Sequence, residues 1–307
     1  MNFSALLSKM VLFIVLLLIG YFASRKGFLS RDFSKSASWL LLNVFLVASI
    51  VNSVLGERPS LSGKELWMVL LFMTVLMVLC YLMGAICAHF DRDKTSVQTF
   101  LLIGVMNSLY VGLPVAQALC GSEGVFYIGL SCIPFNILLY TWGMWALRHG
   151  KGEKGIKLKE MISAPLISSL LSLLIFVLDI RVPKMVSEML SSVAAATIPI
   201  SMLVIGATLG SVSLSEAFSK KKLYMINLVR LIVAPLLIYF LFRPFTSNQT
   251  LLVSAVIVAA CPCGVLSTPM SIQYGYDPEY TSECIMLSTA LSMVTLPTLI
   301  WMLFSRV

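Results

Sequence analysis

Two stretches of the chain decide its fold: Asn107-Ser-Leu-Tyr-Val-Gly-Leu-Pro114 and Pro262-Cys-Gly-Val-Leu-Ser-Thr-Pro269. Each lies inside a long apolar run and carries proline and glycine where a membrane helix would otherwise continue. Proline lacks an N–H and its ring clashes with the preceding turn, so each stretch predicts an interrupted helix. Asn107 and Pro262 stand as far apart in the sequence as Pro114 and Pro269. The matched interruptions therefore predict an internal repeat.

The composition around these stretches is that of an integral membrane protein. Of 307 residues, 59% are hydrophobic and only 12% are charged, whereas a soluble domain has about 25% charged residues. The net charge of +8 does not indicate a nucleic-acid partner, because Lys and Arg gather in the cytoplasmic loops of multi-pass proteins. We expect an all-α polytopic protein whose surroundings are the lipid bilayer.

A spanning helix needs about 20 mainly apolar residues. Ten such segments are predicted, at roughly 7–23, 37–55, 66–88, 96–119, 124–147, 161–178, 190–211, 223–242, 250–273 and 280–304. A basic loop from Arg148 to Lys159 divides them into halves of five, residues 1–150 and 151–307. Because each half has an odd number of spans, the halves are predicted to be inverted relative to one another.

The basic residues predict the orientation of these spans. Connections that follow odd-numbered spans carry fourteen Lys and Arg, and the opposite side, termini included, carries seven. The positive-inside rule then places the central loop in the cytoplasm and both termini outside. We expect a multi-pass protein of a cell membrane.

The interruptions also predict a binding site. Gly112 before Pro114, and Ser267-Thr268 before Pro269, are suited to begin new half-helices, whose N-termini carry partial positive charge and bind anions. Asn107 adds an amide that is able to bond a carboxylate. No charged residue occurs at 95–122 or 244–276, so such a site would hold an anion without a fixed charge. The alternative is that Asn107 bonds a neighbouring helix and the prolines only bend theirs.

Each of the other polar residues inside or near the spans has two possible roles. Asn136 is a candidate for lining the substrate path or for bonding another helix. Arg230 is a charge within span 8, and such residues are functional candidates by default, although its side chain is also able to extend toward the interface. Glu123 and Glu283, near span starts, are candidates for proton coupling or gating, or else face water.

No enzyme or metal centre is predicted. The seven cysteines form no CxxC and the two histidines have no companion ligands, so neither a metal ion nor a disulfide framework is expected. Phosphate-binding, zinc-protease and serine-hydrolase motifs are absent. We expect no cofactor and no catalytic residue.

Four parts of the chain together resemble a known family. These are Asn107 to Pro114 with Gly121, the stretch from Ala196 to Gly210 with Pro199 and Gly206, the Arg230-to-Pro235 spacing, and the stretch from Ala259 to Pro297. They are similar in order and spacing to the auxin efflux carrier family, which includes plant PIN-type carriers and bacterial malonate- and malate-type permeases. The resemblance covers nearly the whole chain and implies the inner membrane of a bacterium.

The resemblance implies the fold of bile-acid/sodium symporters and Na⁺/H⁺ antiporters. Broken spans 4 and 9 would cross at their midpoints, where Pro262, Cys263 and Gly264 would join Asn107. Spans 1, 2, 6 and 7 would form a scaffold, and spans 3–5 and 8–10 a transport domain that moves like an elevator. Related folds also imply a homodimer formed through the scaffold.

The function expected from these features is secondary transport of small organic anions, either auxin-like carboxylates or dicarboxylates. Two alternatives remain open from the sequence. One is a sodium-coupled symporter of the bile-acid type, and the other is a membrane sensor that binds its ligand without transporting it.

Overall fold

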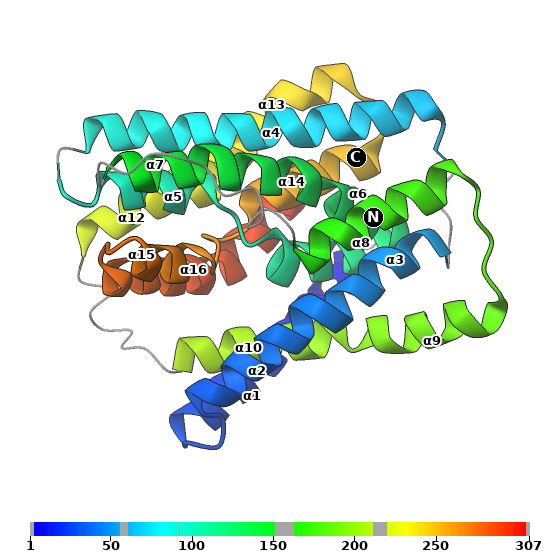
Figure 1. Cartoon of the computed structure of the whole chain (residues 1–307), viewed down its shortest axis with the longest axis horizontal. Helices are drawn as coiled ribbons and strands as arrows, with labels where there is room; N and C mark the ends of the chain where they lie inside the picture. Colours follow the sequence, from blue (N-terminus) through cyan, green and yellow to red (C-terminus); the bar gives the residue numbers. More distant parts are fainter. Residues whose placement is uncertain (1–2, 56–60, 92, 151–162, 211–219, 305–307) are drawn as a thin grey trace.

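The computed structural model is helical, and it describes residues 3–55, 61–91, 93–150, 163–210 and 220–304. The side chains of residues 3–10, 31, 32, 35 and 269 lie outside this description. Within the described residues the only β-type pairing is an isolated antiparallel bridge between Met106 and Cys263. Figure 1 shows many of the helices running along the length of the molecule, whereas the N-terminal helices, in blue, run obliquely.

The first half of the chain forms long helices that contain π-helical turns, labelled η1–η3. Its elements are α1 (Phe3–Arg25), α2 (Arg31–Leu40), η1 (Leu41–Phe45), α3 (Leu46–Leu55), α4 (Gly63–Phe90), α5 (Ser96–Gly104), η2 (Ser108–Gly112), α6 (Leu113–Leu138), η3 (Leu139–Gly143) and α7 (Met144–His149).

The second half is also helical, and its described part contains a π-helical turn and a 3₁₀ turn. Its described elements are α8 (Ala164–Val177), α9 (Lys184–Ala195), α10 (Thr197–Gly210), α12 (Lys221–Leu228), the π-helical turn η5 (Val229–Val233), α13 (Ala234–Phe242), the 3₁₀ turn η6 (Arg243–Phe245), α14 (Gln249–Ala260), α15 (Ser267–Gln273) and α16 (Pro278–Phe304).

All ten predicted segments fall on helices, but fewer helices qualify as spans by length and composition. Six helical runs in the described chain are long and apolar enough to cross a membrane, and shorter apolar stretches are Val11–Arg25 of α1, α8 and α14. One of the six, Ser108–His149, has 42 residues and bends at Gly121, where φ is 61° and ψ is −150°. The chain is therefore a polytopic membrane protein, and ten spans in two inverted repeats remain a prediction.

Helices α1, α2, α3, α8, α9 and α10 pack against one another, and we call them the first helix group. Helix α1 lies along α10, and α3 packs on both α8 and α9. Figure 1 shows α1, α2, α9 and α10 on the side of the molecule opposite α4 and α13. These six helices correspond to predicted spans 1, 2, 6 and 7.

Glycine allows the close approach of α1 and α10. A Cβ built on Gly206 would lie 2.0 Å from the Leu17 carbonyl oxygen, and one on Gly20 would lie 2.3 Å from the Leu203 carbonyl oxygen. The two backbones are therefore in direct contact, as small residues permit between membrane helices.

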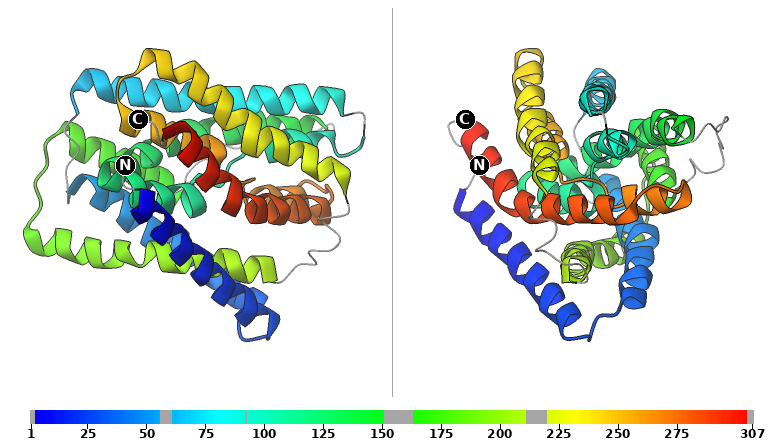
Figure 2. Two further views of the ribbon diagram at one scale, coloured as in Figure 1. Left: turned by 180° about the vertical axis from the view of Figure 1, so that it is seen from behind. Right: turned by 90° about the vertical axis from the view of Figure 1, so that its left-hand side faces the viewer.

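The remaining helices, α4–α7 and α12–α16, form the second helix group, in which α14 is central. Helix α14 packs on α4, α6, α13 and α16, and every one of its residues from Leu251 to Ala260 is buried. In the right-hand view of Figure 2, α13 and α4 lie on the opposite side of the molecule from α1. The two groups meet chiefly through α6, which also packs on α3 and α8.

The connections after predicted spans 3, 5, 7 and 9 meet at one end of the second group. Lys222 Nζ lies 2.6 Å from Asp91 Oδ1 and 3.0 Å from Asp93 Oδ2. Arg148 Nη2 donates to the Tyr274 hydroxyl at 3.2 Å. Most of the basic central loop, 151–162, lies outside the described residues.

Candidate functional site

The first interruption lies between α5 and η2. Helix α5 ends at Gly104, Val105 is extended with φ −93° and ψ 122°, and the helix resumes at Ser108. Asn107 occupies the position before that new helix, but its side chain makes no capping bond to it. The leading N–H groups of η2 and the Asn107 amide consequently lie together.

The second interruption lies between α14 and α15. Helix α14 ends at Ala260, Cys261 is extended with φ −62° and ψ 145°, and α15 begins at Ser267. Pro262 has no N–H to continue the α14 ladder, which accounts for the break at this point.

The two interruptions cross and bond to each other through their backbones. Asn107 N–H donates to the Pro262 carbonyl oxygen at 2.9 Å, and Gly264 N–H donates to the Val105 carbonyl oxygen at 2.9 Å. These bonds flank the Met106–Cys263 bridge. Backbone N–H and C=O groups that lose their helical partners at the two interruptions thus hydrogen-bond to each other. Irregular backbone inside a membrane needs such partners.

Glycine on both interrupted segments allows neighbouring side chains to pack closely at the crossing. A Cβ on Gly264 would lie 2.6 Å from Val105 Cγ1, and a Cβ on Gly112 would lie 2.8 Å from Cys261 Sγ. A larger residue at either position would therefore require the Val105 or Cys261 side chain to shift.

Asn107 provides the polar side chain at the crossing. It is 4% exposed, and its Nδ2 has no hydrogen-bond partner among the described residues. A buried amide donor without a partner costs on the order of 1–3 kcal/mol. This donor is therefore suited to an oxygen acceptor supplied by a ligand.

The structure corrects the expected start of the first half-helix, whereas the second half-helix starts within the expected stretch. We expected new half-helices to begin at the Gly112–Pro114 and Ser267–Pro269 stretches. Instead the helix already resumes at Ser108, and Pro114 follows the π-helical turn η2. The wider turn accommodates the proline ring without a break. In α15, which has seven residues, Ser267 is the first helical residue and Pro269 the third.

The other residues predicted near the second interruption have separate surroundings. Cys263 N–H donates to Ser288 Oγ of α16 at 2.9 Å. Ser267 is fully buried and its Oγ has no partner among the described residues. Thr268 Oγ1 lies 3.3 Å from Ser282 Oγ, so this hydroxyl joins α15 to α16.

Asn136 has partners away from the crossing. Its Nδ2 donates to the Cys132 carbonyl oxygen at 2.8 Å, and its Oδ1 accepts from Ser163 Oγ at 3.2 Å. Ser163 in turn caps α8. The Asn136 amide therefore joins α6 to the start of α8, in agreement with the helix-bonding alternative.

The three charged candidates also have defined partners. Arg230 is 0% exposed and bonds to α4 and α14, so its side chain does not extend to an interface. Glu283 is 1% exposed, and one of its carboxylate oxygens lies 2.5 Å from Lys220 Nζ. Glu123 accepts a hydrogen bond from the Tyr127 hydroxyl.

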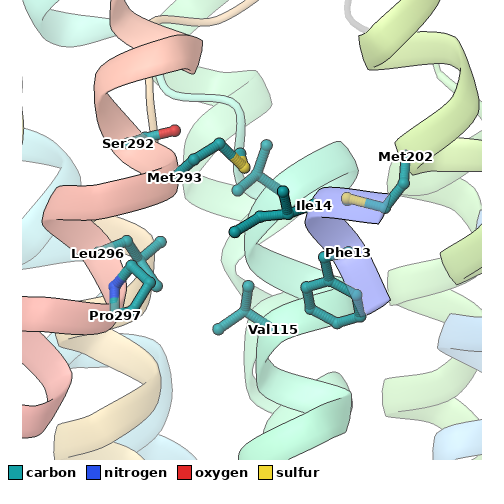
Figure 3. Close-up of a pocket in the computed structure, with 9 residues that line it drawn as sticks. Phe13, Ile14, Val115, Met202, Ser292, Met293, Leu296 and Pro297 are labelled. Carbon is teal, nitrogen blue, oxygen red and sulfur yellow. The ribbon is translucent and has the colours of Figure 1, made fainter. Parts of the chain in front are cut away.

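A small hollow adjoins the crossing, between the two helix groups. Its cavity volume is about 20 Å³, and its lining is apolar except for Ser292. Figure 3 shows the side chains that face it from α1, α10, α6 and α16. The lining residues are Phe13, Ile14, Val111, Val115, Met202, Ser292, Met293, Leu296 and Pro297.

The hollow begins one helical turn from the crossing on two helices. Val111 N–H donates to the Asn107 carbonyl oxygen, and Ser292 follows Ser288, which bonds Cys263, by one turn of α16. Sequence reasoning did not identify Val105 or the lining residues of α1 and α10. Their side chains are ordinary apolar ones, so only their spatial position marks them.

Comparisons with known proteins identify a family of similar sequences. A sequence model of membrane transport proteins matches residues 5–155 and 151–301. An uncharacterized transporter of Methanothermobacter thermautotrophicus is 27% identical over 304 residues, covering 92% of this chain and 94% of its own. An uncharacterized transporter of Methanocaldococcus jannaschii is 22% identical over 312 residues, covering 95% and 97%.

No group of three or more potential metal ligands occurs among the described residues, and the matching sequences are those of transporters rather than enzymes. The family model covers almost the entire chain in two adjoining matches. The chain therefore belongs to the membrane transport protein family, that of the auxin efflux carriers.

Proposed function

We propose that this protein is a secondary transporter of small organic anions, with carboxylates as substrates. The observation that carries the proposal is the backbone crossing beside the unpartnered, buried amide of Asn107. A helix start and an amide donor together attract a carboxylate oxygen without placing a cation in contact with it. Interrupted helices at corresponding positions of two halves are the usual place for a transporter's substrate.

The apolar hollow supports a substrate with a nonpolar part. A carboxylate held at Asn107 would have its remaining atoms one turn away, against residues such as Val111 and Met293. Only Ser292 offers a polar side chain there. The apolar lining consequently favours monocarboxylates with a nonpolar body over small dicarboxylates, and the hollow would have to widen to admit one.

The proposed mechanism is alternating access of the elevator type. Predicted spans 1, 2, 6 and 7 make up the first helix group, and spans 3–5 and 8–10 make up the second. The hollow and the crossing lie where the groups meet, so movement of one group against the other would carry the site across the membrane. The proposal includes ten spans in inverted halves, with both termini outside.

Proton coupling is part of the same proposal, with Glu283 as the first candidate. This carboxylate is buried, and its Oε1 has no partner among the described residues. Flux into liposomes that responds to an imposed pH gradient would support coupling. Flux indifferent to both pH gradient and membrane potential would instead make the protein a uniporter.

A thermal-shift panel tests the substrate class. Purified protein is heated with benzoate, phenylacetate, indole-3-acetate, malonate and malate in turn, and Asn107→Ala serves as the binding-site variant. Saturating one of these carboxylates at about 100 times its Kd is worth roughly 2.7 kcal/mol, which raises Tm by several degrees. We expect this rise for an aromatic monocarboxylate and its loss in Asn107→Ala.

Two other outcomes decide against parts of the proposal. A rise that persists in Asn107→Ala would remove the crossing as the binding site. Binding without flux in liposomes would favour a membrane sensor, and flux that requires sodium would favour a sodium-coupled symporter.

A further inference from the structure

Arg230 is a fully buried cation that touches the end of α14. It lies in the π-helical turn η5 of predicted span 8 and is 0% exposed. Its Nη2 donates to the Val258 carbonyl oxygen at 3.2 Å, and its Nη1 donates to Cys80 Sγ on α4 at 3.4 Å. One side chain thus joins three helices of the second group.

The Val258 carbonyl needs this donor because of the second interruption. In an uninterrupted α-helix that carbonyl would accept from the N–H of Pro262, which has none. The backbone offers it only a long bond from Cys261 N–H, at 3.4 Å. A weakly bonded carbonyl is unfavourable inside a membrane, and the guanidinium supplies the hydrogen bond that Pro262 removes.

The charge of Arg230 is not balanced by an acid. Among the described ion pairs, carboxylates pair with Lys184, Lys220, Lys222 and Arg181, and none with Arg230. Its Nε also lacks a partner among the described residues. The C-terminal end of a helix carries about half a negative charge, which offsets only part of the charge of a guanidinium.

The remaining positive charge acts on the crossing. Val258 lies three residues before Cys261, and Cys261 Sγ lies against Gly112 of the other interrupted segment. The start of η2, on the other interrupted segment, adds partial positive charge. In a medium of low dielectric constant a unit charge some 10 Å away still alters anion affinity by about tenfold or more.

We propose that Arg230 is a positioning residue that holds the α14 end at the crossing and makes the crossing prefer anions over neutral analogues. This inference rests on the proposed carboxylate site beside Asn107. Arg230 itself touches no substrate in this arrangement. Its hydrogen bonds fix the backbone, and its charge acts through space.

The test compares an anion with its neutral analogue. The probes are phenylacetate and phenylacetamide, which differ in charge and scarcely in shape, and the readout is the ratio of their Kd values from titration calorimetry. We expect the wild type to bind phenylacetate at least about tenfold more tightly. Arg230→Gln is expected to bring the ratio close to one.

Because Arg230→Gln also removes the bond to Val258, a second variant separates charge from folding. Cys80→Asp places a carboxylate beside the guanidinium, which cancels the charge and keeps the side chain in place. It is expected to lower the ratio as Arg230→Gln does. Cys80→Ser, which adds no charge, is the matched control and is expected to keep the wild-type ratio.

Each result has a distinct meaning. A ratio unchanged in both Arg230→Gln and Cys80→Asp overturns the inference and leaves the carboxylate site standing. Wild-type protein that binds neither probe overturns the proposed site for aromatic carboxylates, and this inference with it. Asn107→Ala is expected to weaken both probes, because it removes a contact rather than a distant charge.

Discussion

Lys222 is the residue that most directly joins the connections at one end of the second helix group. Its Nζ contacts Asp91 Oδ1, Asp93 Oδ2 and Thr95 Oγ1. Burial alone raises the pKa of Asp91, but the hydrogen bonds from Lys222 and Thr99 outweigh it and leave the pKa below the ordinary 3.8.

This pKa shift predicts a pH-dependent effect of Lys222→Met. A carboxyl group whose pKa is lowered by folding stabilises the fold above its unfolded pKa, and that stabilisation disappears as pH falls through the folded pKa. We expect the variant to melt below the wild type between pH 5 and pH 8. The difference in Tm should then shrink below about pH 4, as followed by thermal melts in a nonionic detergent.

Lys221→Met is the matched control, because Lys221 is the exposed neighbour on the same helix. It removes the same charge and is expected to leave Tm almost unchanged at every pH. A Tm difference for Lys222→Met that stays constant from pH 7 to pH 3 would show that Asp91 is not the partner that matters.

At the residue scale, side-chain chemistry was easier to predict than backbone chemistry. Asn107 stood out because an amide inside a long apolar run needs a partner. Val105 gave no such signal, although its carbonyl oxygen accepts one of the two bonds that hold the crossing. Backbone N–H and C=O groups are the same in nearly every residue, so which of them bond at the crossing follows only from where the two segments meet.

At the scale of elements, the contact between α1 and α10 depends on the absence of side chains. A Cβ on Gly206 would lie 2.0 Å from the Leu17 carbonyl oxygen and 3.0 Å from Tyr21 N. Both are backbone atoms of α1, which move only if the helices separate. We expect Gly206→Ala to destabilise the protein by roughly 1–3 kcal/mol and to lower Tm by several degrees in a thermal melt.

Gly63→Ala provides the comparison for this variant. Gly63 begins α4, and a Cβ there would have nothing within 4 Å. The same substitution is therefore expected to leave Tm unchanged or slightly raised. If both alanine variants melted alike, α1 and α10 would not be packed backbone to backbone.

The helices themselves were largely predictable, and their interruptions were predictable only approximately. Apolar runs locate helices because burying those runs dominates the free energy. The first break lies several residues before Pro114 because the π-helical turn η2 absorbs the proline. Such turns depend on neighbouring helices, and a single sequence does not show them. Gly206 and Gly210 have the spacing of a GxxxG packing motif, a signal that our interpretation of the sequence missed.

At the scale of the whole molecule, the sequence resemblance identified the family, whereas the contact between the helix groups required the structure. The hollow is lined by Phe13 of α1 and Met202 of α10 on one side, and by α6 and α16 on the other. Residues so far apart in the chain have no common pattern. Their meeting follows from how the two groups pack.

Movement between the groups predicts the effect of a cross-link placed across the hollow. Phe13 and Leu296 line it from α1 and α16, so Phe13→Cys with Leu296→Cys, joined by a short bifunctional maleimide, would tie the groups together. We expect liposome uptake of the carboxylate identified by the thermal-shift panel to fall roughly tenfold or more. Tyr239 and Phe304, whose rings lie 5.4 Å apart within the second group, give the matched pair, and their cross-link should leave uptake largely intact. Equal uptake from both cross-linked proteins would rule out an elevator, because transport would then proceed without relative movement of the two groups.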